Sequence, residues 1–196
     1  MRKLAVLVVG LALASGCRAK EKPADVDQLV AQLQSEDPQK SGAARLQLIA
    51  LGEPAVPALS QLLRTGAPAQ RIAAANALWA MGPRARGAVA DLASALVDPD
   101  PTLRLSSAMA LQNLGEAAAP AVPALVRALG DRDPAVRQAA VKALGAVGPG
   151  ASAALPALTS ALKRGSWPEA EEAVRRIRGI TPAAPAEPRS RPRPAP

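Results

Sequence analysis

Between residues 131 and 162, apolar side chains recur at intervals of three and four residues, with one interruption at a glycine. This spacing places the apolar side chains on one face of a helix. Asp133 and Pro134 begin the first run, because a carboxylate caps the first turn of a helix and proline needs no hydrogen-bond partner there. Gly148 lies at the interruption, where we expect a left-handed residue that ends the first helix. The segment therefore predicts two consecutive helices.

The same two-helix unit occurs four times, at intervals of 30 or 33 residues. The prolines that begin its first helices are Pro38, Pro68, Pro101 and Pro134, and the glycines that end them are Gly52, Gly82, Gly115 and Gly148. Asp precedes three of these prolines and Ala67 precedes the other. Because a cap contributes about 1 kcal/mol, we expect the second unit to begin less firmly. The coincidence of caps, breaks and apolar positions indicates a repeat array.

The array has a different kind of segment at each end. Residues 25–34 match a lone second helix, and residues 168–178 match a shortened, charged first helix that Gly179 ends. Such a polar helix covers the last apolar face of an array. We expect Trp167, immediately before this helix, to pack onto the same end of the array. We therefore assign residues 25–179 to about four full repeats plus end helices. Residues 180–196 are rich in Pro and Arg and predict a disordered tail.

The motifs of the unit resemble those of a known repeat. An Asp-Pro-x-x-Arg start, an Ala-rich first helix ending in Leu-Gly, and Val-Pro-Ala-Leu in the second helix are similar to HEAT-like repeats, of the variety first named from phycobilisome lyases. The resemblance implies an all-α fold: a right-handed, armadillo-like α-solenoid of stacked antiparallel helix pairs. It also implies that the second helices line a concave, partner-binding surface. Ser41 departs from the motif, since the other three copies carry Arg there.

The first residues resemble a bacterial lipoprotein signal. Residues 1–16 contain two basic residues and then an apolar run, too short to span a bilayer, and Cys17 follows. The resemblance implies cleavage before Cys17, attachment of lipid to it, and a tether over residues 17–24. It places the protein in the bacterial cell envelope, and Arg18 after the cysteine favours the outer membrane, facing the periplasm. An ordinary signal peptide and an uncleaved anchor are the alternatives.

The composition restricts the chemistry. The chain has 24 Lys and Arg against 16 Asp and Glu, a net charge of +8, a single Cys, and no His, Phe or Tyr. Without His, the usual base for a Ser or Thr nucleophile near neutral pH is missing. The glycines end helices instead of forming a phosphate-binding loop. We therefore expect no enzymatic activity, no metal site, no cofactor and no small-molecule substrate.

Two sets of residues are candidates for binding a partner. The exposed side of the second helices provides Gln61, Arg64, Asp91, Ser94, Arg127, Ser160 and Lys163. Trp79 is a binding hot spot if it is exposed, but burial against the neighbouring repeat is the favoured expectation. Arg71, Arg104 and Arg137 recur every 33 residues, and we expect them to pair with the cap and loop acids Asp98, Asp100, Asp131 and Asp133, tying repeats together, rather than to bind an acidic partner.

The favoured function is a membrane-anchored scaffold that binds an unidentified envelope protein through the concave face. A chromophore lyase, or an accessory to one, is an alternative suggested by the namesake of the repeat. Nucleic-acid binding is a third possibility that the basic charge allows. We expect no nucleic-acid partner, because three of the basic residues lie in the tail and aromatic side chains for base stacking are missing.

Overall fold

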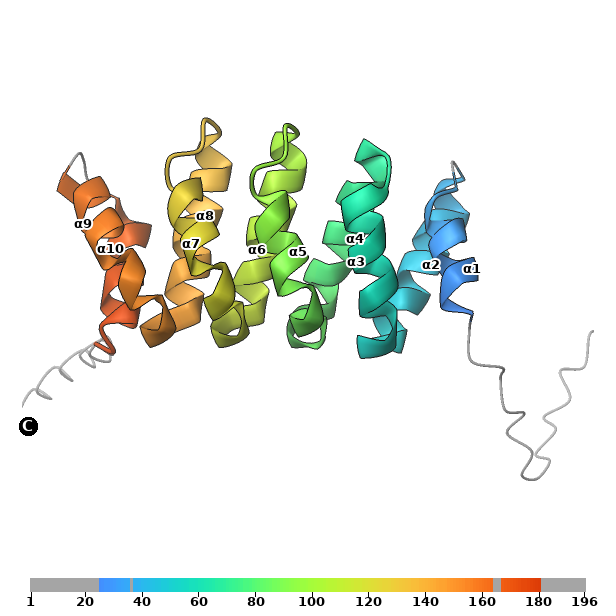
Figure 1. Cartoon of the computed structure of the whole chain (residues 1–196), viewed down its shortest axis with the longest axis horizontal. Coiled ribbons are helices and arrows are strands. Elements are labelled where there is room, and N and C mark those ends of the chain that lie inside the picture. The colour runs from blue at the N-terminus through green and yellow to red at the C-terminus, as the bar shows by residue number, and fades with distance from the viewer. Residues whose placement is uncertain (1–24, 36, 164–166, 181–196) are drawn as a thin grey trace, which may run out of the picture.

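The computed structural model describes residues 25–35, 37–163 and 167–180, and within these ranges it contains helices and no strand (Figure 1). The elements are α1 (Val26–Leu33), α2 (Pro38–Leu51), η1 (Glu53–Ala55), α3 (Val56–Thr65), α4 (Pro68–Met81), η2 (Gly82–Ala88), α5 (Val89–Ala95), α6 (Pro101–Leu114), η3 (Gly115–Ala121), α7 (Val122–Ala128), α8 (Pro134–Val147), η4 (Gly148–Ala154), α9 (Leu155–Lys163) and α10 (Pro168–Ile177), where η marks a 3-10 helix. The signal peptide, Cys17, the tether and residues 181–196 of the tail lie outside the described residues.

The even-numbered helices, here called the first helices, begin as predicted. The Oδ1 atoms of Asp37, Asp100 and Asp133 each accept a hydrogen bond from a backbone amide two residues later, at 2.8–2.9 Å. Ala67 has no side-chain oxygen, and the Oε1 of Gln70 instead accepts a hydrogen bond from the Ala67 amide at 2.9 Å. Each of the four repeats thus begins with a first helix of 14 residues.

The glycines that end the first helices lie at the predicted breaks, but their backbone conformation differs from that of a left-handed helical residue. The φ angles of Gly52, Gly82, Gly115 and Gly148 are +71°, +57°, +57° and +66°. Their ψ angles lie between −131° and −140°, whereas a left-handed helical residue has ψ near +47°. The prediction of left-handed helical residues is therefore wrong in ψ. The observed region is the mirror image of the extended one, which only glycine adopts readily.

A 3-10 segment follows each of these glycines, and the sequence did not predict it. η2, η3 and η4 have seven residues each, whereas η1 has three. The second helix predicted after each glycine is present, and in three of the repeats it begins only after this seven-residue segment, at Val89, Val122 and Leu155. The first connection is shorter than the others because η1 has four residues fewer than η2, η3 and η4.

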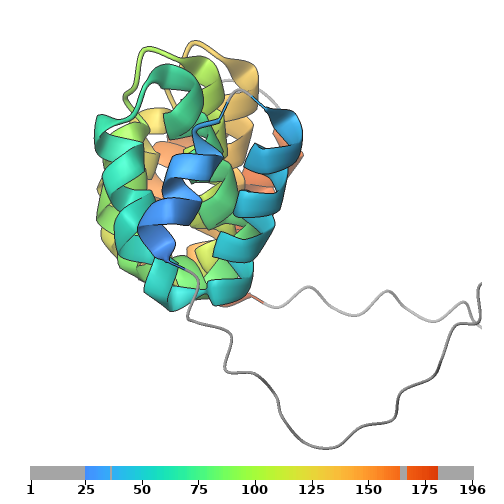
Figure 2. The same cartoon turned by 90° about the vertical axis from the view of Figure 1, so that its right-hand side faces the viewer.

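The helices form two layers of a solenoid. The odd-numbered second helices, α1, α3, α5, α7 and α9, lie in front of the first helices in Figure 1, and Figure 2 looks along the row from its N-terminal end, where α1 and α2 form a pair. The core between the layers consists of leucines that align from repeat to repeat. These residues, each at most 1% exposed, are Leu48, Leu78, Leu111, Leu144, Leu59, Leu92, Leu125 and Leu158. The predicted all-α solenoid is thus confirmed.

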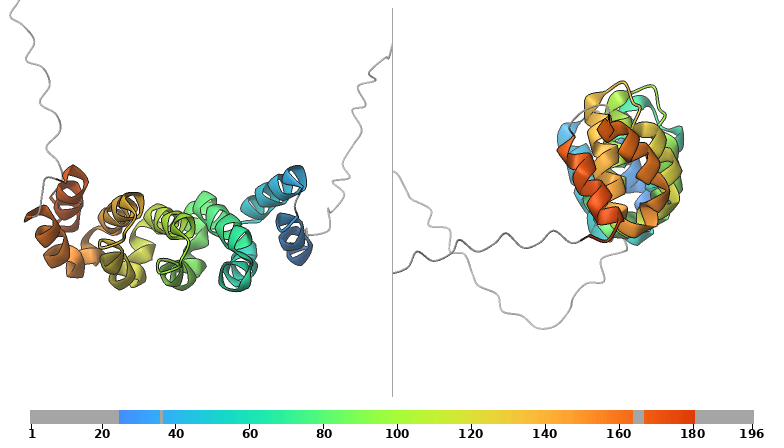
Figure 3. Two further views of the ribbon diagram at one scale, coloured as in Figure 1. Left: turned by 90° about the horizontal axis from the view of Figure 1, so that it is seen from above. Right: turned by 90° about the vertical axis from the view of Figure 1, so that its left-hand side faces the viewer.

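The first helices form the more closely packed layer. α4 contacts α6, α6 contacts α8 and α8 contacts α10 more extensively than neighbouring second helices contact one another. Buried alanines such as Ala75, Ala110 and Ala143 allow this close approach. The row is slightly bowed, and both of its ends turn toward the first helices (Figure 3, left). The prediction that the second helices line the concave face is therefore wrong, because the first helices lie on the inner side of the bow.

The two ends are covered as predicted. α1 packs against α2 and α3, and α10 packs against α8, α9 and η4. A Cβ atom on Gly145 would lie 3.2 Å from the Cα of Ala173, which shows how closely α10 approaches α8. Trp167 is half-buried and packs beside the start of α8, around Pro134 and Arg137. Among the described residues no single helix is long and apolar enough to cross a bilayer, although α2 and residues Glu53–Thr65, bent by 120°, pass that test as a pair.

Candidate interaction surface

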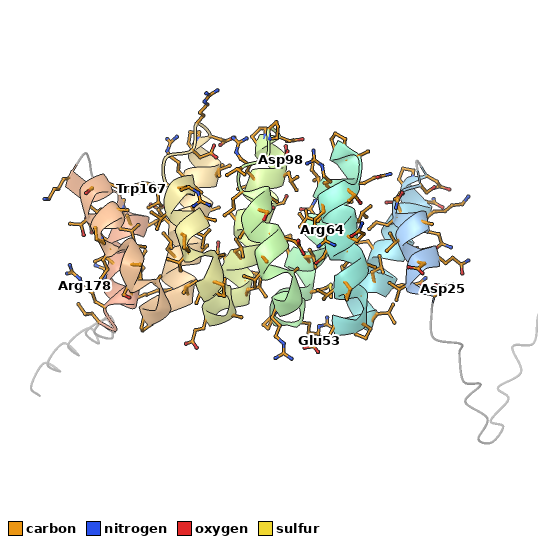
Figure 4. All side chains as sticks on the ribbon, viewed as in Figure 1. Asp25, Glu53, Arg64, Asp98, Trp167 and Arg178 are labelled. Carbon is orange, nitrogen blue, oxygen red and sulfur yellow. The ribbon has the colours of Figure 1, made fainter. Side chains whose placement is uncertain are left out.

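The predicted second-helix residues do not form one site. Arg64 donates from Nη1 to Asp91 Oδ1 at 2.9 Å and from Nη2 to Gln61 Oε1 at 2.6 Å. These three residues therefore connect α3 to α5, and Figure 4 shows Arg64 on this front layer. Ser94 donates from Oγ to the carbonyl of Ala90 at 2.9 Å, within its own helix. The network ties adjacent repeats together.

The remaining members of that set lie apart. Arg127, on α7, lines a hollow of about 350 Å³ beside Arg104 and Asp131, at the loops that lead into the first helices. Ser160 and Lys163 are exposed on α9. The structure thus places the predicted partner-binding residues at several separate positions along the second helices and does not bring them to one cavity.

Trp79 is exposed, so the favoured expectation of burial is wrong. Its side chain, on α4, is 39% exposed, and its carbonyl accepts a hydrogen bond from Asn113 Nδ2 of α6 at 3.2 Å. The position equivalent to Trp79 holds Gln112 in α6 and Gly145 in α8. Trp79 is therefore an aromatic residue at a surface position of the first helices where α6 and α8 have none.

Trp79 belongs to an apolar strip that crosses three consecutive first helices. Its members, called here the first-helix strip, are Leu46, Ile49, Ile72, Trp79, Leu105 and Met109. Leu46 is 65% exposed, and the four others besides Trp79 are partly buried hydrophobic residues packed against the core. The strip lies on the helix faces that point away from the second helices, because Leu46 and Met109 come eight residues after the opening prolines, opposite the core leucines. Sequence reasoning missed this strip.

The same face becomes polar in α8 and α10. A hollow of about 550 Å³ there is lined by Gln112, Lys142, Glu169, Glu172 and Arg176 among others. Its acids have local partners: Glu172 accepts hydrogen bonds from Arg175 and Arg176 at 2.9 Å, and both lower the pKa of its carboxyl group. Gln138 donates to Glu169 at 2.6 Å. The first-helix face is thus apolar toward the N-terminal end and charged toward the C-terminal end.

Two of the three recurring arginines, Arg71 and Arg104, form the ion pairs that the sequence predicts. Arg71 pairs with Asp98, and Arg104 donates from Nε and Nη2 to Asp131 at 2.7 and 2.8 Å. Arg104 also donates to the carbonyls of Asp98 and Pro99. Arg137 makes the equivalent bonds to two loop carbonyls, at 2.9 and 3.1 Å. Arg71 and Arg104 therefore connect successive repeats, whereas Arg137 bonds to the loop of its own repeat, and among the described residues none of the three pairs with Asp100 or Asp133.

The described residues contain no group of three or more Cys, Asp or Glu side chains that could hold a metal ion. Many of the acids are caps, acids paired with arginines, or members of the charged end of the first-helix face.

Comparisons with known proteins agree with this architecture. The family model for HEAT repeats matches residues 26–112 and 89–177. An engineered protein is 24% identical, with a TM-score of 0.60 over 79% of this chain and 80% of that chain. The complex of CpcE and CpcF of phycocyanin lyase from Nostoc is 23% identical, with a TM-score of 0.59 over 76% and 95%. A designed armadillo repeat protein in complex with the peptide (KR)4 is 19% identical, with a TM-score of 0.58 over 79% and 80%.

At these identities the structural likeness shows the fold alone. No curated protein sequence matches the chain at a significant level. The family match covers both halves of the array, including the end helices α1 and α10.

Proposed function

Because the chain belongs to the HEAT-repeat family, we propose that it is a non-catalytic scaffold that binds another protein of the bacterial cell envelope and is held on a membrane by lipid attached to Cys17. Stacked repeats provide an extended, rigid surface on which a partner can lie across several units. The observation that carries the proposal is the first-helix strip, an apolar surface shared by α2, α4 and α6.

The strip has the composition expected of a protein-binding surface. Exposed apolar patches that continue over several elements mark interaction sites more often than isolated apolar residues do. Leu46 and Trp79 are its most exposed members, at 65% and 39%. Trp is the residue type most enriched among binding hot spots, because one side chain provides a large contact area at a low entropic cost. The partner of this proposal is thus a protein segment that presents apolar side chains.

Chemical crosslinking on intact cells, followed by affinity capture of the protein, tests the scaffold proposal. We expect discrete crosslinked species that Trp79→Ala weakens at least fivefold. Val97→Ala is the matched control, because Val97 is 69% exposed and lies outside the strip. If no stable species forms, or if both variants reduce it equally, the proposed use of the strip is incorrect.

The anchor has a separate test. The resemblance of residues 1–17 to a lipoprotein signal supports it, and the outer membrane, with the solenoid facing the periplasm, is the proposed location. Two or three acyl chains would hold the protein on a bilayer, since each buried methylene contributes about 0.8 kcal/mol. Cys17→Ala should release the protein from the membrane fraction, and mass spectrometry should find the wild-type N-terminus acylated at Cys17. Membrane association that survives Cys17→Ala would remove the anchor from the proposal.

No observation favours the two other functions. The likeness to the phycocyanin lyase complex, at 23% identity, concerns the fold. Base stacking on single-stranded nucleic acid needs aromatic platforms, and the chain has two Trp and neither Phe nor Tyr. Protein binding therefore remains the function that the surface supports best.

A further inference from the structure

A pocket of about 410 Å³ opens between the first two repeats, on the side of the 3-10 segments. Val56, Pro57 and Ser60 of α3 form one wall, and Arg84, Arg86 and Gly87 of η2 form another. Arg64, Asp91 and Glu53 complete the lining. Here the array has its irregular connection, since η1 is four residues shorter than η2.

The charged residues of this pocket depart from the repeat. Arg84 aligns with Ala117 and Gly150, and Arg86 aligns with Ala119 and Ser152. Asp91 aligns with alanine in each of the other three copies. The solenoid therefore does not need charged side chains at these positions, because the other copies form the same elements without them.

The three guanidinium groups of the pocket differ in their pairing. Arg64 pairs with Asp91 at 2.9 Å, and Arg86 pairs with Glu53 at 3.1 Å. Arg84 has no carboxylate within 4.0 Å among residues 25–35, 37–163 and 167–180. Its side chain lies along the turn at Gly52, where an added Cβ would be 3.1 Å from Arg84 Nη1. Three guanidinium groups against two carboxylates leave one uncompensated positive charge.

Ser60 adds a second indication. The residue is 5% exposed, and its Oγ has no hydrogen-bond partner in the part of the chain that the structure describes. Buried hydroxyl groups are usually hydrogen-bonded, because an unpaired one has lost its water without replacement. The lining thus combines an unpaired hydroxyl group, an unpaired guanidinium group and the apolar surface of Val56 and Pro57.

We propose that this pocket binds a monocarboxylate. A single negative charge neutralises the uncompensated guanidinium, and the planar carboxylate matches its two parallel N–H donors. Val56 and Pro57 would contact the carbon chain of the ligand. A dianion such as phosphate would carry one charge too many beside Asp91 and Glu53. The inference concerns the second-helix side of the array and does not depend on the proposed scaffold or its first-helix strip.

Titration of the purified protein with sodium acetate at constant ionic strength tests the proposal, observed through the side-chain Nε–Hε signals of ¹⁵N-labelled arginine. We expect saturable shifts of the Arg64, Arg84 and Arg86 signals. Acetamide, which is neutral, should produce none, and inorganic phosphate should bind at least fivefold more weakly than acetate. N-acetylglycine, which imitates a peptide terminus, separates the two sources of the carboxylate: tighter binding than acetate indicates a chain end, and equal or weaker binding indicates a free acid.

Five variants, two of which are controls, make the test specific. Arg84→Gln should weaken acetate binding at least tenfold, whereas Arg45→Gln, at an exposed position outside the pocket, should leave it within twofold. Arg86→Gln should weaken binding at least threefold, and its side chain is 70% exposed, so the fold should tolerate the change. Ser60→Ala should weaken binding, and Ser107→Ala, at the other buried unpaired serine, should not. Linear shifts that chloride reproduces, or equal effects of Arg84→Gln and Arg45→Gln, would overturn the proposal.

Discussion

Arg104 lies between two repeats and contacts both of them. Its guanidinium donates two hydrogen bonds to Asp131 and two to loop carbonyls of its own repeat. The side chains of Arg104 and Asp131 are 14% and 9% exposed, so solvent screens this pair less than it screens a surface pair. The sequence predicted this ion pair, because an arginine that recurs once per repeat is expected to have a structural role in joining neighbouring repeats. It could not predict the pocket, since Arg84 and Arg64 are 20 residues apart and meet only after folding.

The Arg104–Asp131 pair predicts a pH dependence. The hydrogen bond from Arg104 lowers the pKa of Asp131 below its ordinary value of 3.8, and the same bond raises the pKa of Arg104. A carboxyl group with a lowered folded pKa stabilises the protein above its unfolded pKa, and this contribution is lost as the pH falls through the folded pKa. Asp131→Asn should therefore lower the free energy of unfolding at pH 6 by about 1–3 kcal/mol. The difference from wild type should shrink below about pH 4.

Urea unfolding at pH 6 and at progressively lower pH measures this difference. Glu116→Gln, at an exposed position, is the control and should change the free energy of unfolding by less than about 0.5 kcal/mol at every pH. A difference between Asp131→Asn and wild type that stays constant with pH would show that the pair does not carry the effect.

Ser107 predicts a stabilising change. The residue is fully buried in α6, and no described residue is within hydrogen-bond reach of its Oγ. The equivalent positions in α4 and α8 are Ala74 and Ala140. Ser107→Ala should therefore raise the free energy of unfolding by about 1 kcal/mol, because it removes a buried unpaired hydroxyl group. A decrease in thermal or urea unfolding experiments would mean that this hydroxyl has a partner.

At the scale of elements, prolines, acids and glycines determine where the first helices begin and end. Their positions could be read from the sequence because capping and φ preferences are local. The 3-10 segments could not be predicted, because the step of three between their buried alanines, such as Ala85 and Ala88, also occurs on one face of an α-helix. The ψ angle of the closing glycines also depends on the chain that follows.

A pair of glycine substitutions tests the role of the breaks. Gly115 has φ +57° and ψ −131°, where an alanine is strained, so Gly115→Ala should lower the free energy of unfolding by about 1–3 kcal/mol. Gly42 lies inside α2 and has open space around its Cβ position. Gly42→Ala should instead raise it by about 0.5–1 kcal/mol. Thermal unfolding of the two variants measures the sign of each change in the free energy of unfolding. Destabilisation by Gly42→Ala would contradict the assignment of a helix at that position.

At the scale of the whole molecule, the closeness of the first helices decides which surface faces inward. Small alanines bring α4, α6 and α8 together, and the row bows toward them (Figure 3). The Ala-rich first helices were visible in the sequence. The direction of curvature was not, because it depends on small differences in packing between the two layers of helices. The family resemblance had implied that the second helices, not the first, line the concave face. Once the copies are aligned on their opening prolines, Leu46 and Met109 can be recognised as large apolar residues opposite the core leucines, whereas the exposure of Trp79 required the structure. The face that holds them is the basis of the proposed function.

Site-specific photo-crosslinking in intact cells tests that claim most directly. A photoreactive amino acid would replace Leu46, Trp79 or Met109 on the first-helix face. In a second set it would replace Ser94, Arg127 or Ser160, which are exposed on the second helices. We predict discrete protein adducts from the first three positions and none above background from the other three. Adducts from the second-helix positions, with none from Leu46, Trp79 or Met109, would contradict the account.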